Sequence, residues 1–144
     1  MLTYSRGGTG VIEDVSVAPT LSEATRLLRS TLPSTIEVNL RVLTPDAVVR
    51  SESVSLQQVL INLCISARDA MVRQKGTIDV SLERLDGWVG HCDSCHGTVD
   101  GSWAVLTVRD TGSGIDEGTL ARMFEPFYST KAVGKGTGMG LPMV

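Results

Sequence analysis

Two segments of the chain place apolar residues at the spacing of an α-helix. In the first segment the apolar residues are three or four positions apart, at Leu21, Ala24, Leu28 and Leu32. A longer apolar stripe runs through residues 56–71. Thr20 and Ser55 each open a capping box, with Glu or Gln three positions later, so we expect the two helices to begin there. Pro33 predicts the end of the first helix.

Other segments alternate apolar and polar residues, which is the pattern of half-buried β-strands. The strands that this pattern predicts are residues 36–42, 47–49, 77–85 and 103–108. In the third of these, Ile78, Val80 and Leu82 should point into the core. Residues 86–101 are polar and contain glycine, so we expect a connection there, and residues 118–124 predict a short helix.

Composition narrows the possible classes of protein. The chain has 144 residues, enough for one domain, with 42% hydrophobic and 20% charged residues, as in an ordinary soluble core. Its net charge of −3 argues against nucleic acid as a main partner. No apolar run is long enough for a transmembrane helix, so we expect no direct membrane insertion. The three cysteines do not form a secreted disulfide framework, which favours a cytoplasmic location.

Two glycine-rich clusters, residues 110–114 and 134–140, flank an aromatic and basic segment at residues 124–131. Alternate glycines let the backbone approach a ligand closely, and successive N–H groups there can hold phosphate oxygens. The spacing fits neither the Walker A loop nor the dinucleotide G-x-G-x-x-G pattern. Asp110 follows a predicted strand and precedes a glycine turn, a common place for a ligand contact in α/β sheets. Together the clusters predict a nucleotide site.

One face of the second predicted helix is polar, with Asn62, Ser66, Asp69 and Arg73 at helical spacing. For most helices such a face is simply solvent-exposed. Here apolar residues, among them Leu63 and Ile65, lie close around the polar ones. This favours a polar face that meets a ligand.

In this order the segments resemble the ATP-binding catalytic domain of sensor histidine kinases. That domain belongs to the wider ATPase group of DNA gyrase, heat-shock chaperones and mismatch-repair ATPases. Residues 56–71 resemble the family's N box, residues 110–115 the G1 box, residues 124–131 the F box and residues 134–141 the G2 box. The Glu-Pro-Phe-Tyr-Ser-Thr-Lys sequence in the F box favours a kinase. The implied fold is the Bergerat-type α/β two-layer sandwich, a mixed sheet with helices on one face.

The resemblance implies roles for individual residues around ATP. Asp110 would accept the adenine amino group, and Gly112 and Gly114 would let the backbone approach the base. Lys131 or Lys135 would supply positive charge near the phosphates. The residues expected to bind nucleotide are Asn62, Ser66, Asp69, Asp110, Gly112, Gly114, Ile115, Phe124, Phe127, Lys131, Lys135, Gly136, Thr137, Gly138, Met139, Gly140 and Leu141.

The resemblance also implies Mg²⁺, held between the phosphates and a side-chain oxygen of the N-box helix. The family's usual ligand is an asparagine four residues after Asn62, where this chain carries Ser66. Asn62 and Ser66 are therefore the expected metal residues. A hydroxyl is shorter than an amide, so an alternative is a degenerate nucleotide-binding regulatory module without kinase activity.

The family's organisation predicts partners beyond this segment. Residues 1–14 would be the end of an upstream dimerisation helix with its linker. Residues 15–144 would be the catalytic domain, truncated at its C-terminal end. The γ-phosphoryl group of ATP would pass to a histidine outside the chain, in the dimerisation domain of the same parent protein. A response-regulator receiver domain would act downstream.

A second candidate chemistry lies in the motif C-x-x-C-H, where His91, Cys92, Cys95 and His96 are close in sequence. This pattern occurs in covalent haem attachment and contains side chains that can bind zinc. The interpretation that we favour is a variable hairpin loop with reduced thiols. A metal- or redox-responsive interaction domain built around this loop is a second alternative function. Cys64 is expected to be a small core residue.

Overall fold

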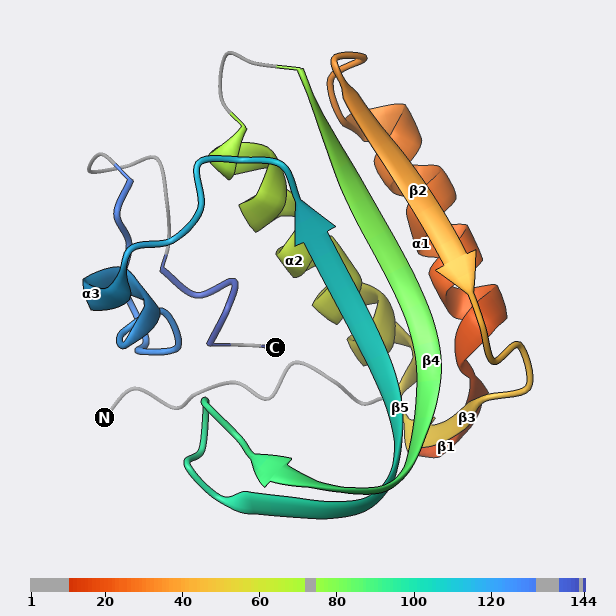
Figure 1. Cartoon of the computed structure of the whole chain (residues 1–144). Coiled ribbons are helices and arrows are strands. Elements are labelled where there is room, and N and C mark those ends of the chain that lie inside the picture. Colours follow the sequence, from red (N-terminus) through yellow and green to blue (C-terminus); the bar gives the residue numbers. More distant parts are fainter. Residues whose placement is uncertain (1–10, 72–74, 132–137, 143) are drawn as a thin grey trace.

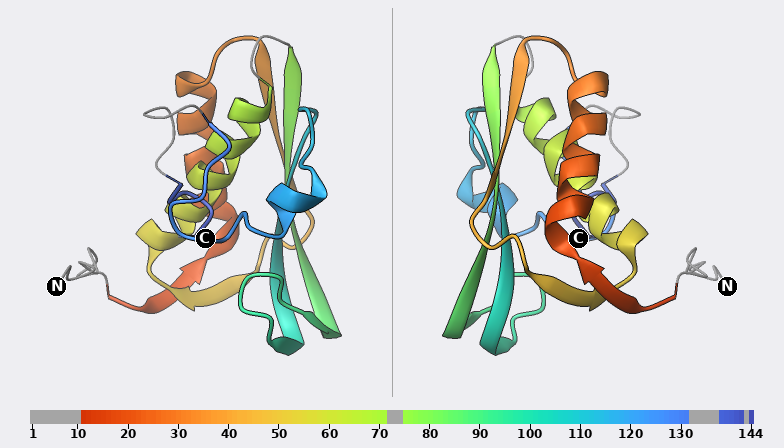
Figure 2. Two further views of the ribbon diagram at one scale, coloured as in Figure 1. Left: turned by 90° about the vertical axis from the view of Figure 1, so that its left-hand side faces the viewer. Right: turned by 90° about the vertical axis from the view of Figure 1, so that its right-hand side faces the viewer.

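Two helices lie against one face of a β-sheet in the computed structural model, which describes residues 11–71, 75–131, 138–142 and 144 (Figure 1). The helices are α1 (Val17–Thr31) and α2 (Ser53–Ala70). The sheet consists of β2 (Ile36–Val42), β4 (Gly76–His91) and β5 (Thr98–Asp110). Seen edge-on in Figure 2, both long helices lie on the same side of the sheet. This confirms the predicted two-layer sandwich.

The sheet is mixed, as the sequence predicted. β2 pairs with β4 in parallel, and β4 pairs with β5 in antiparallel orientation. A separate two-stranded antiparallel sheet joins β1 (Glu13–Ser16) to β3 (Val48–Ser51). The sequence did not predict β1, since Val15 is its one buried residue and no alternation is visible in four residues. Residues 1–10 lie outside the described part of the chain.

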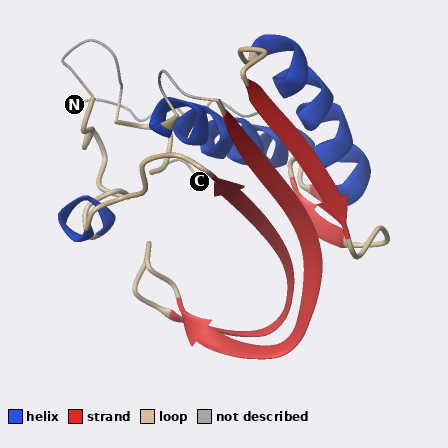
Figure 3. Ribbon diagram, turned by 45° about the horizontal axis from the view of Figure 1, so that its top comes forward, coloured by secondary structure: helices blue, strands red, loops and turns tan. Residues whose placement is uncertain are grey.

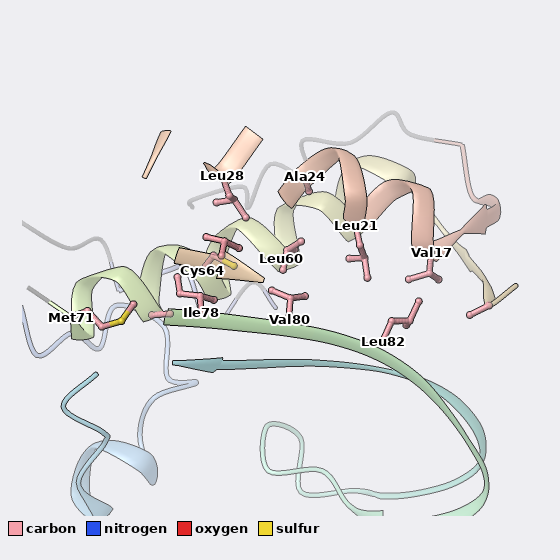
Figure 4. Close-up of a cluster of buried hydrophobic side chains, with 13 residues drawn as sticks. Val17, Leu21, Ala24, Leu28, Leu60, Cys64, Met71, Ile78, Val80 and Leu82 are labelled. Carbon is pink, nitrogen blue, oxygen red and sulfur yellow. The ribbon is translucent and has the colours of Figure 1, made fainter. Parts of the chain in front are cut away.

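The core lies between the helices and the inner face of β4. Figure 4 shows its side chains reaching toward one another from both layers. Its fully buried members include Leu21 from α1 and Leu60 and Cys64 from α2. They meet Ile78, Val80 and Leu82 of β4, so the inward alternation predicted for this strand is confirmed. Because α2 packs on the core with one face, its opposite face is available for contacts with other parts of the chain or with a ligand.

Both helices begin earlier than the capping boxes predicted. α1 has Ser16 as its N-cap residue, and Thr20 Oγ1 donates to the Ser16 carbonyl at 3.0 Å instead of capping the helix. α2 has Glu52 as its N-cap residue, and Ser55 Oγ contacts Glu52 Oε2 at 3.3 Å. The predicted starts were wrong because burial of Val17 on the core extends α1 beyond its local capping signal. α1 does end at Thr31, before Pro33.

β4 and β5 continue well past the helices as a long hairpin, so the connection predicted at residues 86–101 was wrong. We call residues 86–101 the hairpin arm. Its ladder resumes at the pair Trp88 and Gly101 after a register shift that follows Leu85. Gly87, with φ 65°, accommodates the irregularity. In Figure 3 the two strands curve together away from the helices. The arm shows no apolar alternation in its sequence, because neither face of its strands packs on the core.

Beyond β5 the described chain contains one short helix, α3 (Glu117–Leu120), shorter than the predicted 118–124. Asp116 caps it, since its Oδ1 accepts the Thr119 N–H at 3.0 Å. Turns then lead to Lys131. Among the described residues, no helix is long and apolar enough to cross a membrane.

Candidate functional site

A cavity of about 730 Å³ separates α2 and the end of β5 from the segments that follow β5. We call its first side, formed by α2 and residues 108–110, the helix wall. We call its second side, formed by residues 113–131 and 138–142, the loop wall. In Figure 1 the loop wall lies beside α2 and the C-terminal end of β5. The cavity therefore joins the regions that contain the four predicted motifs.

The polar face of α2 supplies much of the helix wall. Asn62, Ser66 and Asp69 all line the cavity, as the face predicted from the sequence required. The opposite face of the helix buries Leu60 and Cys64 in the core. Burial raises the pKa of the Cys64 thiol to about 11, so this cysteine is a packing residue, as predicted. The core thus fixes the direction in which the polar face points.

Asp110, the last residue of β5, reaches the cavity from the edge of the sheet. Its Oδ1 accepts the N–H of Gly112 at 2.8 Å, which closes a tight turn directly after the strand. The turn is tied to α2 because the Ser113 N–H donates to the Ala70 carbonyl at 3.1 Å. The Asp110 carboxylate is therefore held in place by both layers of the fold.

The two glycines of this turn serve different purposes. A Cβ on Gly112 would lie 2.7 Å from the Ala70 Cβ and 2.8 Å from the Ala70 carbonyl oxygen, so this glycine allows the turn to pack on α2. Gly114 has φ 76°, which favours glycine. No described atom lies within 4 Å of the place where its Cβ would be. Gly114 therefore leaves open space at its own place in the cavity lining.

Polar contacts fasten the loop wall to the helix wall. Lys131 Nζ forms an ion pair with Asp69, and Asn62 Nδ2 donates to the Gly140 carbonyl at 3.1 Å. Within the loop wall, the Phe127 N–H donates to the Gly138 carbonyl at 2.8 Å. The side-chain contacts of Asn62 and Asp69 with the loop wall come from the same polar face of α2 that lines the cavity.

Asp69 is the electrostatic centre of this attachment. Its side chain is 22% exposed and pairs with Arg68 at 2.7 Å as well as with Lys131. Burial on its own raises the pKa of Asp69, but the hydrogen bonds and positive charges of Lys131 and Arg68 outweigh burial and lower that pKa. Asp69 is therefore ionised at neutral pH and holds Lys131 at the cavity.

Asn62 is held on both ends of its amide. Its Nδ2 bonds to Gly140, and its Oδ1 accepts from Gln58 Nε2 at 2.8 Å. Gln58 lies one helical turn earlier, so the pair stabilises the orientation of the amide along the helix. A carbonyl oxygen has two lone pairs, so Oδ1 can still accept a further partner.

The structure brings most of the predicted nucleotide residues together. Those that line the cavity are Asn62, Ser66, Asp69, Asp110, Gly114, Ile115, Lys131, Gly138, Gly140 and Leu141. Four others do not line it: Gly112, Phe124, Phe127 and Met139. Phe127 is 73% exposed and has φ 66°. The predictions for Lys135, Gly136, Thr137 and Arg73 fall outside the described residues.

Sequence reasoning missed a polar and aromatic group in the loop wall. Tyr128, Thr119 and Asp116 all line the cavity. The Tyr128 hydroxyl lies 3.4 Å from Thr119 Oγ1, and the Arg122 guanidinium lies 4.3 Å from the Tyr128 ring centroid. The sequence does contain one signal for this group: Asp116 and Thr119 have the spacing of a helix N-cap, which predicts that they lie close together.

Known proteins place this geometry in a family. Residues 51–144 match the family described as histidine kinase-, DNA gyrase B-, and HSP90-like ATPase. The two-component sensor PprA of Pseudomonas aeruginosa is 42% identical over 108 residues, which are 74% of this chain and 10% of that protein. The sensor kinase CckA of Brucella abortus is 33% identical over 147 residues, covering 100% of this chain and 15% of its own length. The chain thus spans a small part of these relatives.

Solved structures share the fold. The catalytic domain of the histidine kinase ThkA has a TM-score of 0.71 at 22% identity, covering 92% of this chain and 76% of its own. The mycobacterial sensor histidine kinase MprB has a TM-score of 0.69 at 24% identity, covering 92% of this chain and 75% of its own. The family match and these likenesses agree with the arrangement of the motifs around the cavity. The chain therefore belongs to the histidine kinase-, DNA gyrase B- and HSP90-like ATPase family, as an ATP-binding catalytic domain of the two-component sensor histidine kinase type.

Proposed function

We propose that this chain binds ATP with Mg²⁺ in the cavity between the helix wall and the loop wall, and that the γ-phosphoryl group passes to a histidine outside the chain. One observation carries the proposal. The Asp110 carboxylate and the polar face of α2 meet across one cavity of about 730 Å³, a volume that suits a ligand of nucleotide size. The ATPase family of the chain supports the choice of nucleotide.

Adenine would lie against Asp110 and Gly114. Asp110 Oδ1 already accepts the Gly112 N–H at 2.8 Å, which orients the carboxylate. Its second oxygen is an acceptor, which is what the adenine amino group requires. The open space beside Gly114 supports close approach of a flat base. Val108 and Ile115 add apolar surface to the cavity lining.

The phosphates would lie toward Lys131, Gly138 and Gly140. No described atom lies within 4 Å of the place where a Cβ of Gly140 would be, so an anion can come close to the backbone there. Lys131 is paired with Asp69. A phosphate near Lys131 would compete with that carboxylate, so nucleotide binding would loosen one attachment of the loop wall. The phosphate roles of Lys135, Gly136 and Thr137 rest on the resemblance alone.

Asn62 and Ser66 fit a Mg²⁺ site by the chemistry of their side chains. Both line the cavity, and both offer the oxygen atoms that this ion prefers. Asn62 Oδ1 is held by Gln58 at 2.8 Å but keeps a lone pair for another partner. Mg²⁺ supplies charge neutralisation at the phosphate oxygens when it is bound. The residues of the chain would hold and orient the nucleotide during transfer.

The acceptor histidine would belong to another domain. His91 ends β4 and His96 lies in the loop that follows it, so both are in the hairpin arm and neither is on a helix. We infer that the acceptor lies in the dimerisation domain of the same parent protein. A response-regulator receiver domain would take the phosphoryl group downstream, in the cytoplasm.

A degenerate module that binds nucleotide without transfer is the second candidate. Ser66 favours it, because a short hydroxyl stands where the family's metal ligand is an asparagine. In that case the nucleotide would control the attachment of the loop wall, through Lys131, and not a chemical step.

Calorimetric titration of a non-hydrolysable ATP analogue, with and without Mg²⁺, tests the proposal. We expect saturable binding in both conditions and tighter binding with Mg²⁺. The absence of binding in both would overturn the proposal. Transfer of labelled phosphate from ATP to a supplied dimerisation domain then separates the two candidates, since the degenerate module would bind ATP and leave the histidine unlabelled.

A further inference from the structure

The tip of the hairpin arm holds two cysteines in a short, ordered loop that the ATP site does not use. β4 ends at His91 and β5 begins at Thr98, and these two residues pair in the ladder. The loop between them, residues 92–97, contains Cys92, which is partly buried, and Cys95, which is exposed. The sequence has three cysteines in all, and the third, Cys64, is fully buried in the core.

Backbone hydrogen bonds set the shape of this loop. The Cys92 N–H donates to the Gly97 carbonyl at 2.9 Å, and the His96 N–H donates to the Cys92 carbonyl at 2.8 Å. His96 has φ 58°, a left-handed conformation that turns the chain back toward β5. These bonds bring positions 92 and 95 to the same side of a single turn.

The Cys92 sulfur lies against the backbone of Cys95 within this turn. The Cys95 N–H donates to Cys92 Sγ at 3.4 Å. The N–H of Cys95, then its thiol, then the Ser94 N–H lower the pKa of Cys92, against the smaller opposing effects of burial and of the Asp93 charge. The Cys92 thiol is thus the one whose thiolate these donors stabilise.

We propose that Cys92 and Cys95 are a reactive dithiol that small-molecule disulfides oxidise reversibly to a disulfide within the loop. Cys92 is the attacking sulfur, since several donors stabilise its thiolate. Cys95 is the resolving sulfur, since it lies in the same turn and its backbone N–H already donates to Cys92 Sγ at 3.4 Å. The site is distinct from the ATP cavity, because none of the residues that line the cavity belongs to the arm.

The reaction balances as two thiol–disulfide exchanges. The Cys92 thiolate attacks one sulfur of a disulfide RSSR, forms a Cys92–S–SR bond and releases RS⁻, which takes a proton. The Cys95 thiolate, having given up its proton to solvent, then attacks the Cys92 sulfur and releases the second RS⁻. The protein loses two protons and two electrons as its thiols become a disulfide, and RSSR gains them to become two RSH.

Metal binding is the competing use of this motif. Among the described residues, no group of three or more His, Cys, Asp or Glu side chains is arranged to hold a metal ion. Two thiolates alone leave a tetrahedral zinc site half filled. The loop therefore favours a bond between its own two sulfurs over a metal site within this chain.

The test equilibrates the whole chain with mixtures of reduced and oxidised glutathione, then quenches with acid, alkylates free thiols and measures intact mass. As oxidised glutathione rises, we expect Cys92 and Cys95 to escape alkylation and the chain to be two hydrogen atoms lighter than the unalkylated reduced chain. Cys92 and Cys95 should then be joined in one peptide, and Cys64 should be alkylated only after unfolding. Added reduced glutathione should reverse the change. Ser94→Ala is the matched control, since it lies in the same loop and should still form the disulfide.

Single-cysteine variants separate the two roles. Cys95→Ser should accumulate a mixed disulfide on Cys92 that persists, because no resolving thiol remains. Cys92→Ser should react more slowly and form no intramolecular disulfide. The proposal is overturned if wild type forms no disulfide at any ratio, or if Cys95 becomes glutathionylated as fast in Cys92→Ser as Cys92 does in Cys95→Ser. Stoichiometric zinc in the reduced protein that blocks oxidation until a chelator is added would also overturn it.

Discussion

The two walls of the cavity are held in place by different means. The helix wall is held by the core, because one face of α2 buries Leu60 and Cys64. The other face presents Asn62, Ser66 and Asp69 to the cavity. The loop wall is attached mainly by polar contacts, such as those of Lys131 with Asp69 and Gly140 with Asn62. Several of its apolar side chains are exposed, among them Ile115, Leu120 and Phe127.

This difference separates positioning from access. Side chains on a packed helix stay in place without a ligand, so little ordering is needed when the ligand binds. A wall attached by a few polar contacts opens at low free-energy cost, which admits and releases a ligand. We therefore expect mutations in the helix wall to change stability and affinity, and mutations in the loop wall to change mainly local opening.

The largest contrast should be in global stability. Leu60→Ala removes a fully buried leucine from α2 and should lower the free energy of unfolding by about 2–5 kcal/mol. Leu120→Ala is the matched variant in the loop wall, where the leucine is 56% exposed, and should change it by about 0.5 kcal/mol or less. Urea denaturation measures both. Equal losses in the two variants would mean that the loop wall is packed as firmly as α2.

The next effect concerns the sheet end of the helix wall. Asp110→Asn replaces an acceptor with an amide that can present its donor to the adenine amino group. Loss of a charge-assisted hydrogen bond there should weaken binding of an ATP analogue by roughly 1.5–3 kcal/mol. Unfolding by urea serves as the control and should change much less than in Leu60→Ala. Calorimetry that finds unchanged affinity would remove Asp110 from the site.

A smaller effect should follow from detaching the loop wall at Asp69. Asp69→Asn removes the charge that holds Lys131, at a cost of about 1 kcal/mol or less for so accessible an ion pair. Amide exchange should become faster in residues 123–131 and stay unchanged in β5. Equal acceleration in both regions would show that Asp69 supports the whole fold and not this attachment.

The same ion pair predicts a pH dependence. The pKa of Asp69 is lower in the folded chain than the ordinary value for an aspartate. The contribution of ionised Asp69 to the attachment of the loop wall is therefore fully present above that ordinary pKa value. It is lost as the pH falls through the lowered pKa. The exchange rates of residues 123–131 in wild type should approach those of Asp69→Asn in that acidic range. A difference that stays constant down to the lowest pH would contradict this assignment.

The sequence predicts the elements that pack on the core better than it predicts the loop wall and the hairpin arm. Ile78, Val80 and Leu82 were correctly assigned to the core because alternation directly reflects burial on one face. Periodicity placed Asn62 on a helix and Asp110 at the end of a strand, and the family resemblance placed both at one site. In the structure both line the same cavity. The positions that pack on the core are therefore the ones that the pattern predicts well.

Where local signals compete with tertiary packing, sequence reasoning fails. The capping boxes at Thr20 and Ser55 misplaced both helix starts. Burial of Val17 on the core extends α1 past its local signal, whereas α2 starts at Ser53 with Val54 71% exposed, so core packing does not explain its start. The hairpin arm was mistaken for a connection, because strands with both faces exposed do not need apolar alternation. Tyr128 was not predicted to line the cavity, because its position depends on turns that carry no periodicity.

The smallest expected effect tests the metal position. Ser66→Asn places a longer carbonyl ligand where the cavity meets α2, and should strengthen the Mg²⁺ dependence of ATP-analogue binding by about 1 kcal/mol or less. Asn62→Asp is a useful companion, since it adds charge one helical turn away. Calorimetry with and without Mg²⁺ measures both. If Ser66→Asn leaves the Mg²⁺ dependence as it was, Ser66 is not at the metal position.

The central claim is that Asp110, on the helix wall of the cavity, recognises adenine through its amino group. Competition between ATP and GTP for the chain, displacing a fluorescent ATP analogue, tests it most directly. Guanine presents a carbonyl oxygen where adenine presents its amino group, so a carboxylate should prefer ATP. We predict a clear preference for ATP in wild type and a narrower one in Asp110→Asn. Equal displacement by ATP and GTP in wild type, or a preference that Asp110→Asn leaves unchanged, would contradict the account.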